Sequence, residues 1–293
     1  MELSVVVLAL SANLCFALGS QFFAHYSRTI GSMWMNWAKA SIALICFTIY
    51  CLFFVDHVTL SMKDYSLLLI SGFVALGGGD IFLLKAFSDL GPGRTLMIFG
   101  FQPLILSTAG YYFFDQSIDT SKFWAIAFFI ICLFIFSLEK FKQERSWNLK
   151  GSLFALLGMG LDAFGIIITR SVFDSNPTFS PMEGNAIRCV GAILLFVIIT
   201  KFFKPLMLIQ KFKDFSKRDK GFVILGSLLG TFLSLTFYLN ALKLAHLGSL
   251  SGIAITGTIF ASIFECFYYK RFPSRYLIGA FVSFMLGMKF LLF

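Results

Sequence analysis

Long apolar segments alternate with short polar junctions along the whole chain. A helix that crosses a lipid bilayer needs about 20 apolar residues, because the hydrocarbon core is roughly 30 Å thick and each residue rises 1.5 Å. The apolar runs are continuous and lack the period-two alternation of barrel strands. The pattern therefore predicts an all-α membrane protein with ten transmembrane helices, at approximately 3–24, 33–55, 65–84, 95–114, 121–138, 151–169, 182–200, 221–241, 249–269 and 274–293.

The composition supports a membrane protein and excludes an ordinary soluble domain. Of the 293 residues, 58% are hydrophobic and only 13% are charged, whereas soluble domains carry about 25% charged residues. The net charge of +9 does not indicate a nucleic-acid partner, because the basic residues are divided among the short junctions. We expect a multi-pass protein of the bacterial inner (plasma) membrane, in contact with lipid. The six cysteines lie in apolar runs without metal-ligand spacing, so we expect no metal and no cofactor.

The distribution of Lys and Arg predicts an orientation in the membrane. The odd-numbered junctions carry 17 of these residues and the even-numbered ones carry 4. Cytoplasmic loops are enriched in Lys and Arg, which places the odd junctions in the cytoplasm and both chain ends outside. The one long junction, 201–220, spaces Leu208, Phe212 and Phe215 along one helical face, as in an interfacial helix; the alternative is a solvated loop.

Internal similarity divides the chain into two copies of one unit. A slide of 155 residues lays 83–99 on 238–254, and a slide of 149 residues matches the earlier helices. The matched pairs are Ala86 with Ala241, Gly93 with Gly248, Asn36 with Asn185, Lys39 with Arg188, and Asn13 with Asp162. The units are 1–145 and 146–293, each with five predicted helices. Because five is odd, the second unit crosses the membrane with opposite polarity. Such inverted repeats are typical of alternating-access transporters whose substrate site lies near the midplane.

One stretch also carries a family pattern, GDIFLLKAFSDLGPGRTLMIFGFQPLILSTAGYYFFDQSIDTSKFWAIAFFIICLFIF (79–136). It resembles the drug/metabolite transporter superfamily, EamA type. Ala86, Gly91, Pro103 and Asp115 occupy the family positions, with Asp115 in place of the usual Glu. The second copy keeps Ala241 and Gly248 but has Thr258 for the proline and Lys270 for the acid.

The resemblance implies a secondary transporter, commonly an exporter of amino acids or related metabolites. Many members place both termini in the cytoplasm, opposite to the charge count. Lys39 and Arg188 match a basic residue that members often carry early in helices two and seven.

Ionisable residues inside predicted helices are candidates for function, because a charge at the bilayer centre costs at least about 2.5–3.5 kcal/mol. Asp80 follows three glycines, which allow local unwinding or a close helix crossing. Asp162 lies in the middle of its helix. Small multidrug transporters of the same superfamily exchange a proton for a cation at a first-helix carboxylate, and this resemblance makes Asp162 the leading candidate for coupling or for binding a substrate amine. The alternative is structural ion pairing, Asp162 with Arg188 and Asp80 with Lys39.

Two groups of candidates follow. The predicted substrate-binding residues are Asn13, Phe16, Asp80, Phe101, Gln102, Asp162, Tyr238 and Asn240. The predicted coupling or charge-pairing residues are Asp162, Asp80, Lys39, Arg188 and Glu265. Alternative interpretations stay open: amides as hydrogen bonds between helices, phenylalanines facing lipid, and Glu183 and Glu265 reaching water near helix ends.

We therefore predict a secondary active transporter, and an exporter, that moves a small zwitterionic or cationic metabolite such as an amino acid or derivative, with protons as the coupling ion. The alternatives are a membrane-embedded enzyme and an uptake carrier for a nucleotide-like or vitamin-like metabolite. An enzyme is disfavoured because His25, His57 and His246 sit at separate helix ends without a partner spacing. ATP-driven transport is disfavoured because there is no Walker motif.

Overall fold

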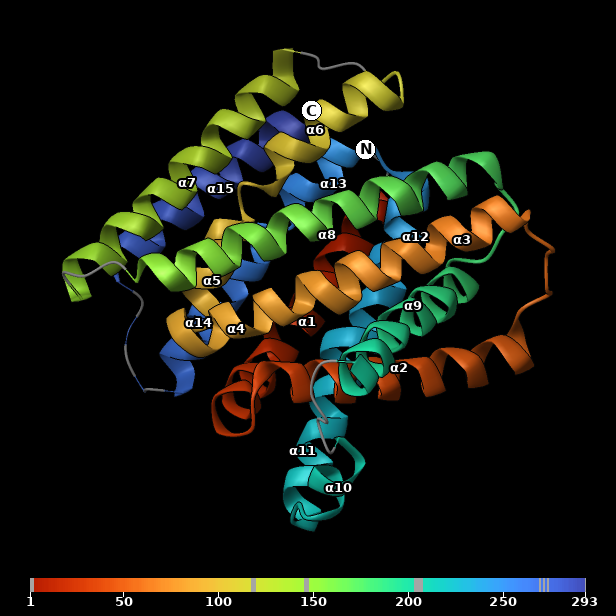
Figure 1. The fold of residues 1–293 in the computed structure, drawn as a ribbon. Helices are drawn as coiled ribbons and strands as arrows, with labels where there is room; N and C mark the ends of the chain where they lie inside the picture. Colours follow the sequence, from red (N-terminus) through yellow and green to blue (C-terminus); the bar gives the residue numbers. More distant parts are fainter. Residues whose placement is uncertain are drawn as a thin grey trace.

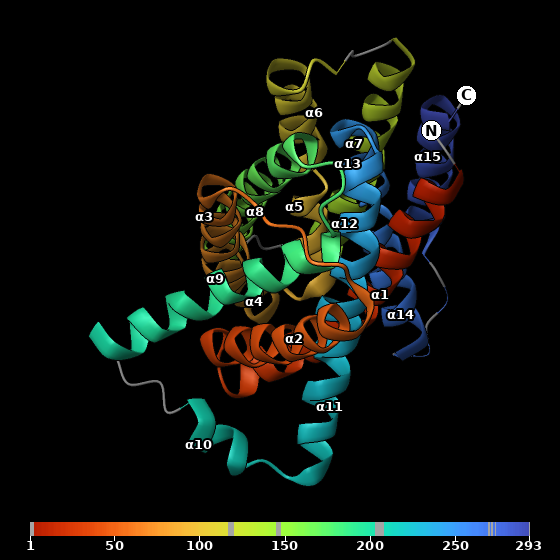
Figure 2. The same cartoon turned by 90° about the vertical axis from the view of Figure 1, so that its right-hand side faces the viewer.

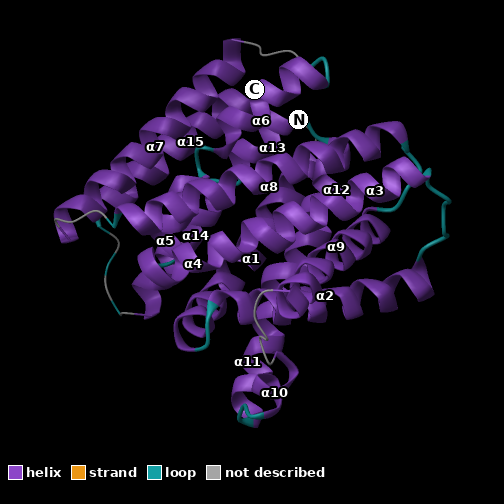
Figure 3. Ribbon diagram, viewed as in Figure 1, coloured by secondary structure: helices purple, strands orange, loops and turns teal. Residues whose placement is uncertain are grey.

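The computed structural model describes residues 3–116, 120–144, 148–202, 208–268, 270, 272 and 274–292, and every element within them is a helix (Figure 3). Up to residue 144 the elements are α1 (Leu3–Thr29), α2 (Ser32–Phe54), α3 (Met62–Ser71), η1 (Gly72–Gly79), α4 (Asp80–Leu90), α5 (Pro92–Phe99), α6 (Gln102–Phe113) and α7 (Thr120–Glu144). The later ones are α8 (Leu149–Ser175), α9 (Pro181–Phe202), α10 (Leu208–Lys213), α11 (Lys217–Ser227), η2 (Leu228–Leu233), α12 (Ser234–Leu244), α13 (Leu247–Ile253), α14 (Thr256–Tyr268) and α15 (Arg275–Leu292).

Six helices within the described residues are long and apolar enough to cross a membrane: Leu3–Thr29, Ser32–Phe54, Met62–Leu90, Leu149–Ser175, Pro181–Phe202 and Lys217–Leu244. The predicted all-helical, multi-span class is confirmed. The fourth and ninth predicted spans are each divided into two short helices, α5–α6 and α13–α14. In α7 and α15 the apolar stretches are only Phe123–Cys132 and Ile278–Gly287. The number ten therefore stays a prediction.

Two of the long spans begin with the same capping motif. Ser61 caps α3 by accepting a hydrogen bond from the Asp64 backbone N–H, and Ser216 caps α11 in the same way with Asp219. A serine or aspartate at such a position satisfies backbone donors that a helix start leaves unpaired. The two motifs are separated by the same 155 residues as the internal sequence match.

The same two spans are interrupted in their middle by π-helices, η1 and η2. A π-helix is wider than an α-helix and occurs mostly as single turns, frequently at functional sites. The Asn36 side chain donates to the carbonyl oxygens of Leu76 and Gly77, at 2.9 and 2.8 Å, within η1. Asn185 donates to the Leu235 carbonyl just after η2, at 3.2 Å. The glycine triplet before Asp80 thus widens its helix and leaves it continuous.

The helices pack in a recurring set of neighbours (Figures 1 and 2). Helix α8 lies against α4 and η1, and α1 lies against α12 and η2. Helices α2 and α9 contact each other, as do α7 and α15, and α6 and α13. The start of α1 and the end of α15 lie near one another at one end of the bundle, in both views. The interior is thus built largely between early and late parts of the chain.

The contact between η1 and α9 depends on glycine. A Cβ atom added to Gly72 would lie 1.8 Å from the carbonyl oxygen of Arg188, and one added to Gly191 would lie 2.2 Å from that of Leu69. Small residues at a crossing let helix backbones approach closely, which is a main source of association between helices in lipid. The glycine-rich segment η1 is therefore both a π-helix and a close helix crossing.

The junction between α9 and α11 is held against the bundle by aromatic rings. The Phe212 ring lies 6.2 Å from that of Trp34 and stacks on it, and the Phe215 ring lies 4.9 Å from the same side chain. These two residues of the predicted interfacial face are therefore partly buried, in contact with α2. The side chain of Leu208 is outside the described residues.

We expect Gly72→Ala to lower the thermal stability of the purified protein in detergent. The added methyl group meets a backbone carbonyl that cannot move without separating η1 from α9, and overpacking of this kind costs about 1–3 kcal/mol. The melting temperature is measured by heating samples and monitoring the loss of the folded protein by size-exclusion chromatography. The matched control is Gly160→Ala on α8, where nothing lies within 4 Å of the new atom. Equal melting temperatures for the two variants would show that the crossing is loose.

Candidate functional site

The structure brings together Lys39 and Asp80, which sequence analysis named as candidates. The Lys39 Nζ atom, from α2, donates to Asp80 Oδ2 at 2.5 Å, directly after η1. Both residues are buried, with 3% and 9% of their surface exposed. The Lys39 ammonium also lies 5.3 Å from the centre of the Phe23 ring, a favourable cation–π distance. The pair is the structural ion pair that the sequence left as an alternative for these residues.

Asp162 and Gln102, also candidates, form a second contact. The Gln102 Nε2 atom, from α6, donates to Asp162 Oδ2 at 2.8 Å. Asp162 lies midway along α8 on a side that packs against η1, since a Cβ atom on Gly79 would come within 3.4 Å of the Asp162 backbone nitrogen. Its side chain is only partly buried. The first-ranked coupling candidate is thus held by a neutral amide.

Arg188 occupies the most buried place of the charged candidates, with 1% of its surface exposed. Its Nε atom donates to Ser71 Oγ at 3.1 Å, at the end of α3. The Ser71 hydroxyl in turn lies 2.8 Å from both the Gly165 carbonyl oxygen and the Thr169 hydroxyl, on α8. A guanidinium carries five N–H donors, and this is its one hydrogen bond among the described residues.

The four charged side chains form one electrostatic cluster around η1. Asp162 interacts with the charges of Asp80, Arg188 and Lys39. Of the two acids, Asp162 acts on Arg188 more strongly than Asp80 does. Tyr238, another candidate, lies close enough to interact with both Asp162 and Arg188. The cluster contains two acids and two bases. Within the described residues, Lys39 and Asp80 are in direct contact, whereas no direct ion pair joins Asp162 to Arg188.

Other candidates have hydrogen bonds or packing outside this cluster. Asn13 Nδ2 donates to the Ile253 carbonyl at 3.1 Å, where α13 gives way to α14, and Asn240 donates to the Thr236 carbonyl of its own helix at 2.7 Å. Phe16 packs against Phe87, with ring centres 6.4 Å apart, and 41% of Phe101 is exposed. The side chain of Glu265 lies outside the described residues. The bond of Asn13 fits the interpretation of amides as hydrogen bonds between helices, whereas the bond of Asn240 stays within α12.

The hydroxyl residues near Arg188 were not among the residues predicted from the sequence. Ser71 and Thr169 carry no signal of their own, because single hydroxyl residues are common in apolar helices. The sequence shows no partner spacing for His57, and in the structure its Nδ1 atom lies 2.6 Å from Glu183 Oε1. The two are separated by 126 residues, which sequence spacing cannot reveal. In the part of the chain that the structure describes, no group of three His, Cys, Asp or Glu residues could hold a metal ion.

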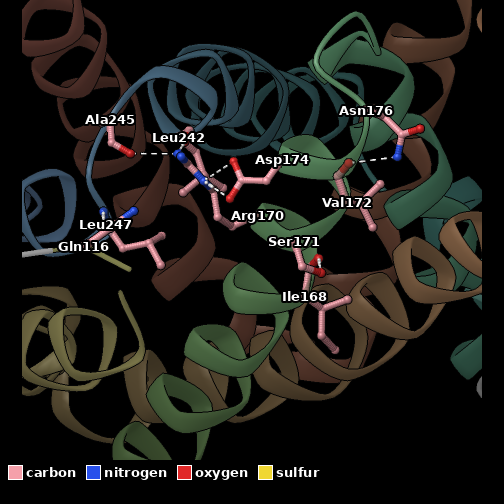
Figure 4. A network of polar contacts seen from close by, with 10 residues as sticks. All are labelled: Gln116, Ile168, Arg170, Ser171, Val172, Asp174, Asn176, Leu242, Ala245 and Leu247. Atoms are coloured by element: carbon pink, nitrogen blue, oxygen red, sulfur yellow. Dashed lines mark hydrogen bonds and ion pairs between the residues drawn. The ribbon is translucent and has the colours of Figure 1, made fainter. Parts of the chain in front are cut away.

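A separate network fastens α8 to α12 (Figure 4). The Arg170 guanidinium donates to the carbonyl oxygens of Leu242 and, at 2.7 Å, of Ala245 at the end of α12. It also forms an ion pair with Asp174, at 2.8 Å. A cation at this position satisfies carbonyls that a helix end leaves unpaired and complements the helix dipole. Beside it, Gln116 Oε1 accepts the backbone N–H of Leu247 at 2.9 Å.

Apolar helices of membrane-spanning length, with charged side chains buried among them, define an integral, multi-pass membrane protein. The model of the EamA-like transporter family matches residues 3–138. Residues 3–138 are therefore similar to this family of membrane transporters, which is part of the drug/metabolite transporter superfamily. No curated protein matches. A solved structure titled only "Crystal structure of protein" is 12% identical, covers 99% of this chain and 97% of its own, and has a TM-score of 0.73, which shows a shared fold.

We expect Lys39→Met to destabilise the protein strongly, because it leaves the Asp80 carboxylate buried without its partner. Removing one member of a buried ion pair costs about 3–5 kcal/mol, whereas replacing both members with neutral groups is often tolerated. The double variant Lys39→Met/Asp80→Asn should therefore recover most of the lost thermal stability, measured in detergent. A double variant as unstable as the single one would mean that Lys39 stabilises through its packing on Phe23 and not through the ion pair.

Proposed function

We propose that this protein is a secondary active transporter that exports small zwitterionic or cationic metabolites, such as amino acids or their derivatives, across a bacterial inner membrane. The observation that carries the proposal is the placement of Asp162, a carboxylate midway along a membrane helix that lacks a direct basic partner among the described residues. Such a group is costly in lipid and is by default a candidate for function. The similarity of residues 3–138 to the EamA-like transporter family supports a transporter.

The architecture we propose is ten transmembrane segments in two inverted repeats, 1–145 and 146–293. Three features recur with the slide of 155 residues: the serine caps of α3 and α11, the π-helices η1 and η2, and the interruptions between α5 and α6 and between α13 and α14. The neighbours of each helix recur as well, since α8 packs on α4 and η1 as α1 packs on α12 and η2. An inverted repeat provides two related conformations, in which the site opens to one side or the other.

In this mechanism Asp162 binds either a proton or the ammonium group of the substrate. Protonation removes its negative charge and, with it, the main attraction for a cation, so the two ligands exclude each other. Gln102 holds the carboxylate through one oxygen and leaves the other for a ligand. Exchange of one for the other across the membrane couples export of the metabolite to entry of a proton. Alternating access supplies the change of side.

We expect Asp162→Asn to abolish flux driven by a pH gradient while the protein still inserts and purifies. The amide is nearly isosteric with the carboxylate but can neither take up a proton nor carry the charge that attracts an ammonium group. The measurement is efflux of a panel of amino acids and amines from proteoliposomes, with and without a pH gradient, with at least a tenfold loss for the variant.

The matched control is Asp174→Asn on the same helix, because the Asp174 side chain is 41% exposed and, among the described residues, forms an ion pair only with Arg170. Its flux should equal that of the unmodified protein. Undiminished gradient-driven flux in Asp162→Asn would remove the carboxylate from the mechanism.

A further inference from the structure

The four charged residues around η1 are unequally paired. Lys39 and Asp80 form a closed ion pair at 2.5 Å. Asp162 and Arg188 interact electrostatically without direct contact, and each is held by a neutral side chain, Gln102 and Ser71 respectively. A buried charge is stable only when it is paired and hydrogen-bonded. We call Asp162 and Arg188 an open ion pair, because neither is in direct contact with an opposite charge among the described residues.

The internal repeat explains why no acid among the described residues forms a direct ion pair with Arg188. Arg188 matches Lys39 in the sequence alignment of the two units, and the slide of 155 residues places Leu235 opposite Asp80. The second unit thus retains the base but has an apolar residue where the first unit has the acid. The neighbouring amides keep their role, since Asn36 bonds to carbonyls of η1 and Asn185 bonds to the carbonyl of Leu235 itself.

The remaining donors of Arg188 are suited to an anion. The guanidinium is planar, always charged, and matches a carboxylate with two parallel hydrogen bonds. Its Nε atom is engaged by Ser71, which fixes the orientation of the fork. With 1% of its surface exposed, Arg188 is shielded from bulk water, so a bound carboxylate would experience little screening.

We propose that Arg188 binds the carboxylate of the transported molecule while Asp162 binds its ammonium group, so that a zwitterion completes the open ion pair. This rests on the proposed transport function and narrows it, because a purely cationic amine would leave Arg188 without a partner and add a second positive charge beside it. Arg188 is then the residue that makes the site select a molecule with both groups. Tyr238 lies beside both charges.

The test removes the carboxylate from the ligand and the guanidinium from the protein, separately and together. Binding is measured as the ligand-induced rise in melting temperature in detergent. A ligand that binds only the folded protein raises this temperature as its concentration exceeds its Kd. The probes are the twenty standard L-amino acids and, for each one that stabilises, the primary amine left by removing its carboxylate. For the unmodified protein we expect the half-saturating concentration of the amine to be at least tenfold higher.

In Arg188→Gln the amino acid should bind as weakly as its amine, whereas binding of the amine should be unchanged or tighter. Loss of the ligand carboxylate and loss of the guanidinium are then not additive, as expected for two groups in contact. Arg188→Lys, which keeps the charge without the fork, should be intermediate and serves if Arg188→Gln does not fold. The matched control is Arg170→Gln, since Arg170 is engaged by Asp174 and the end of α12; its ratio of amine to amino acid should not change.

The inference is overturned if no amino acid stabilises the protein, if amine and amino acid stabilise it equally, or if Arg188→Gln weakens both alike. The proposed transport function is tested separately by flux. Selective binding without flux in proteoliposomes would leave Arg188 as the residue that binds a ligand carboxylate, and it would remove the proposed transport function. If amines and amino acids are transported equally well, the transport function stands and the role of Arg188 in binding a carboxylate is removed.

Discussion

A charge placed among apolar helices has no water to solvate it, and this constraint organises the centre of the molecule. Taking an ion out of water costs several kcal/mol even after the protein relaxes, so a partner must be built beside it. Lys39 and Asp80 meet the demand with a direct contact of 2.5 Å. Asp162 and Arg188 meet it only in part, through neutral side chains and through the field of the other charges. The equal number of acids and bases keeps the cluster neutral as a whole.

The π-helix η1 explains how these groups converge. Ser71 precedes it and Asp80 follows it. In an uninterrupted α-helix these two residues, nine positions apart, would be separated by about two and a half turns and would point in opposite directions. A wider helix makes fewer turns over the same residues, which reduces that angle. Glycine lets the widened segment lie close to both α8 and α9, since Gly79 meets Gly158 and Gly72 meets Arg188, backbone to backbone. The backbone geometry of η1 therefore determines where the charged side chains lie.

Much of this could be predicted from the sequence, and the reason is that lipid imposes strong patterns. Apolar length predicted the six helices that are long enough to cross a membrane. The cost of intramembrane charge selected Lys39, Asp80, Asp162 and Arg188 among its candidates. What sequence could not supply was pairing. Nothing in the chain shows that Lys39 meets Asp80 while Arg188 meets Ser71, because those contacts depend on rotation of helices about their axes. The π-helices were also beyond reach, since three glycines allow several backbone forms and η2 has only one glycine.

In the architecture that we propose, the two units share helix caps and π-helices but differ in charge, and a carrier needs such a difference to bind its substrate. The matched serine caps and π-helices would let either unit take the conformation of the other, as alternating access requires. A site of the same strict symmetry would carry two closed ion pairs, and it would hold no ligand. Replacing the second acid by Leu235, and placing Asp162 on α8 opposite Asn13 of α1, breaks the symmetry only at the side chains. In this proposal, motion and recognition depend on separate features of the repeat: motion depends on the backbone, which the units share, and recognition depends on four charged side chains, which they do not share.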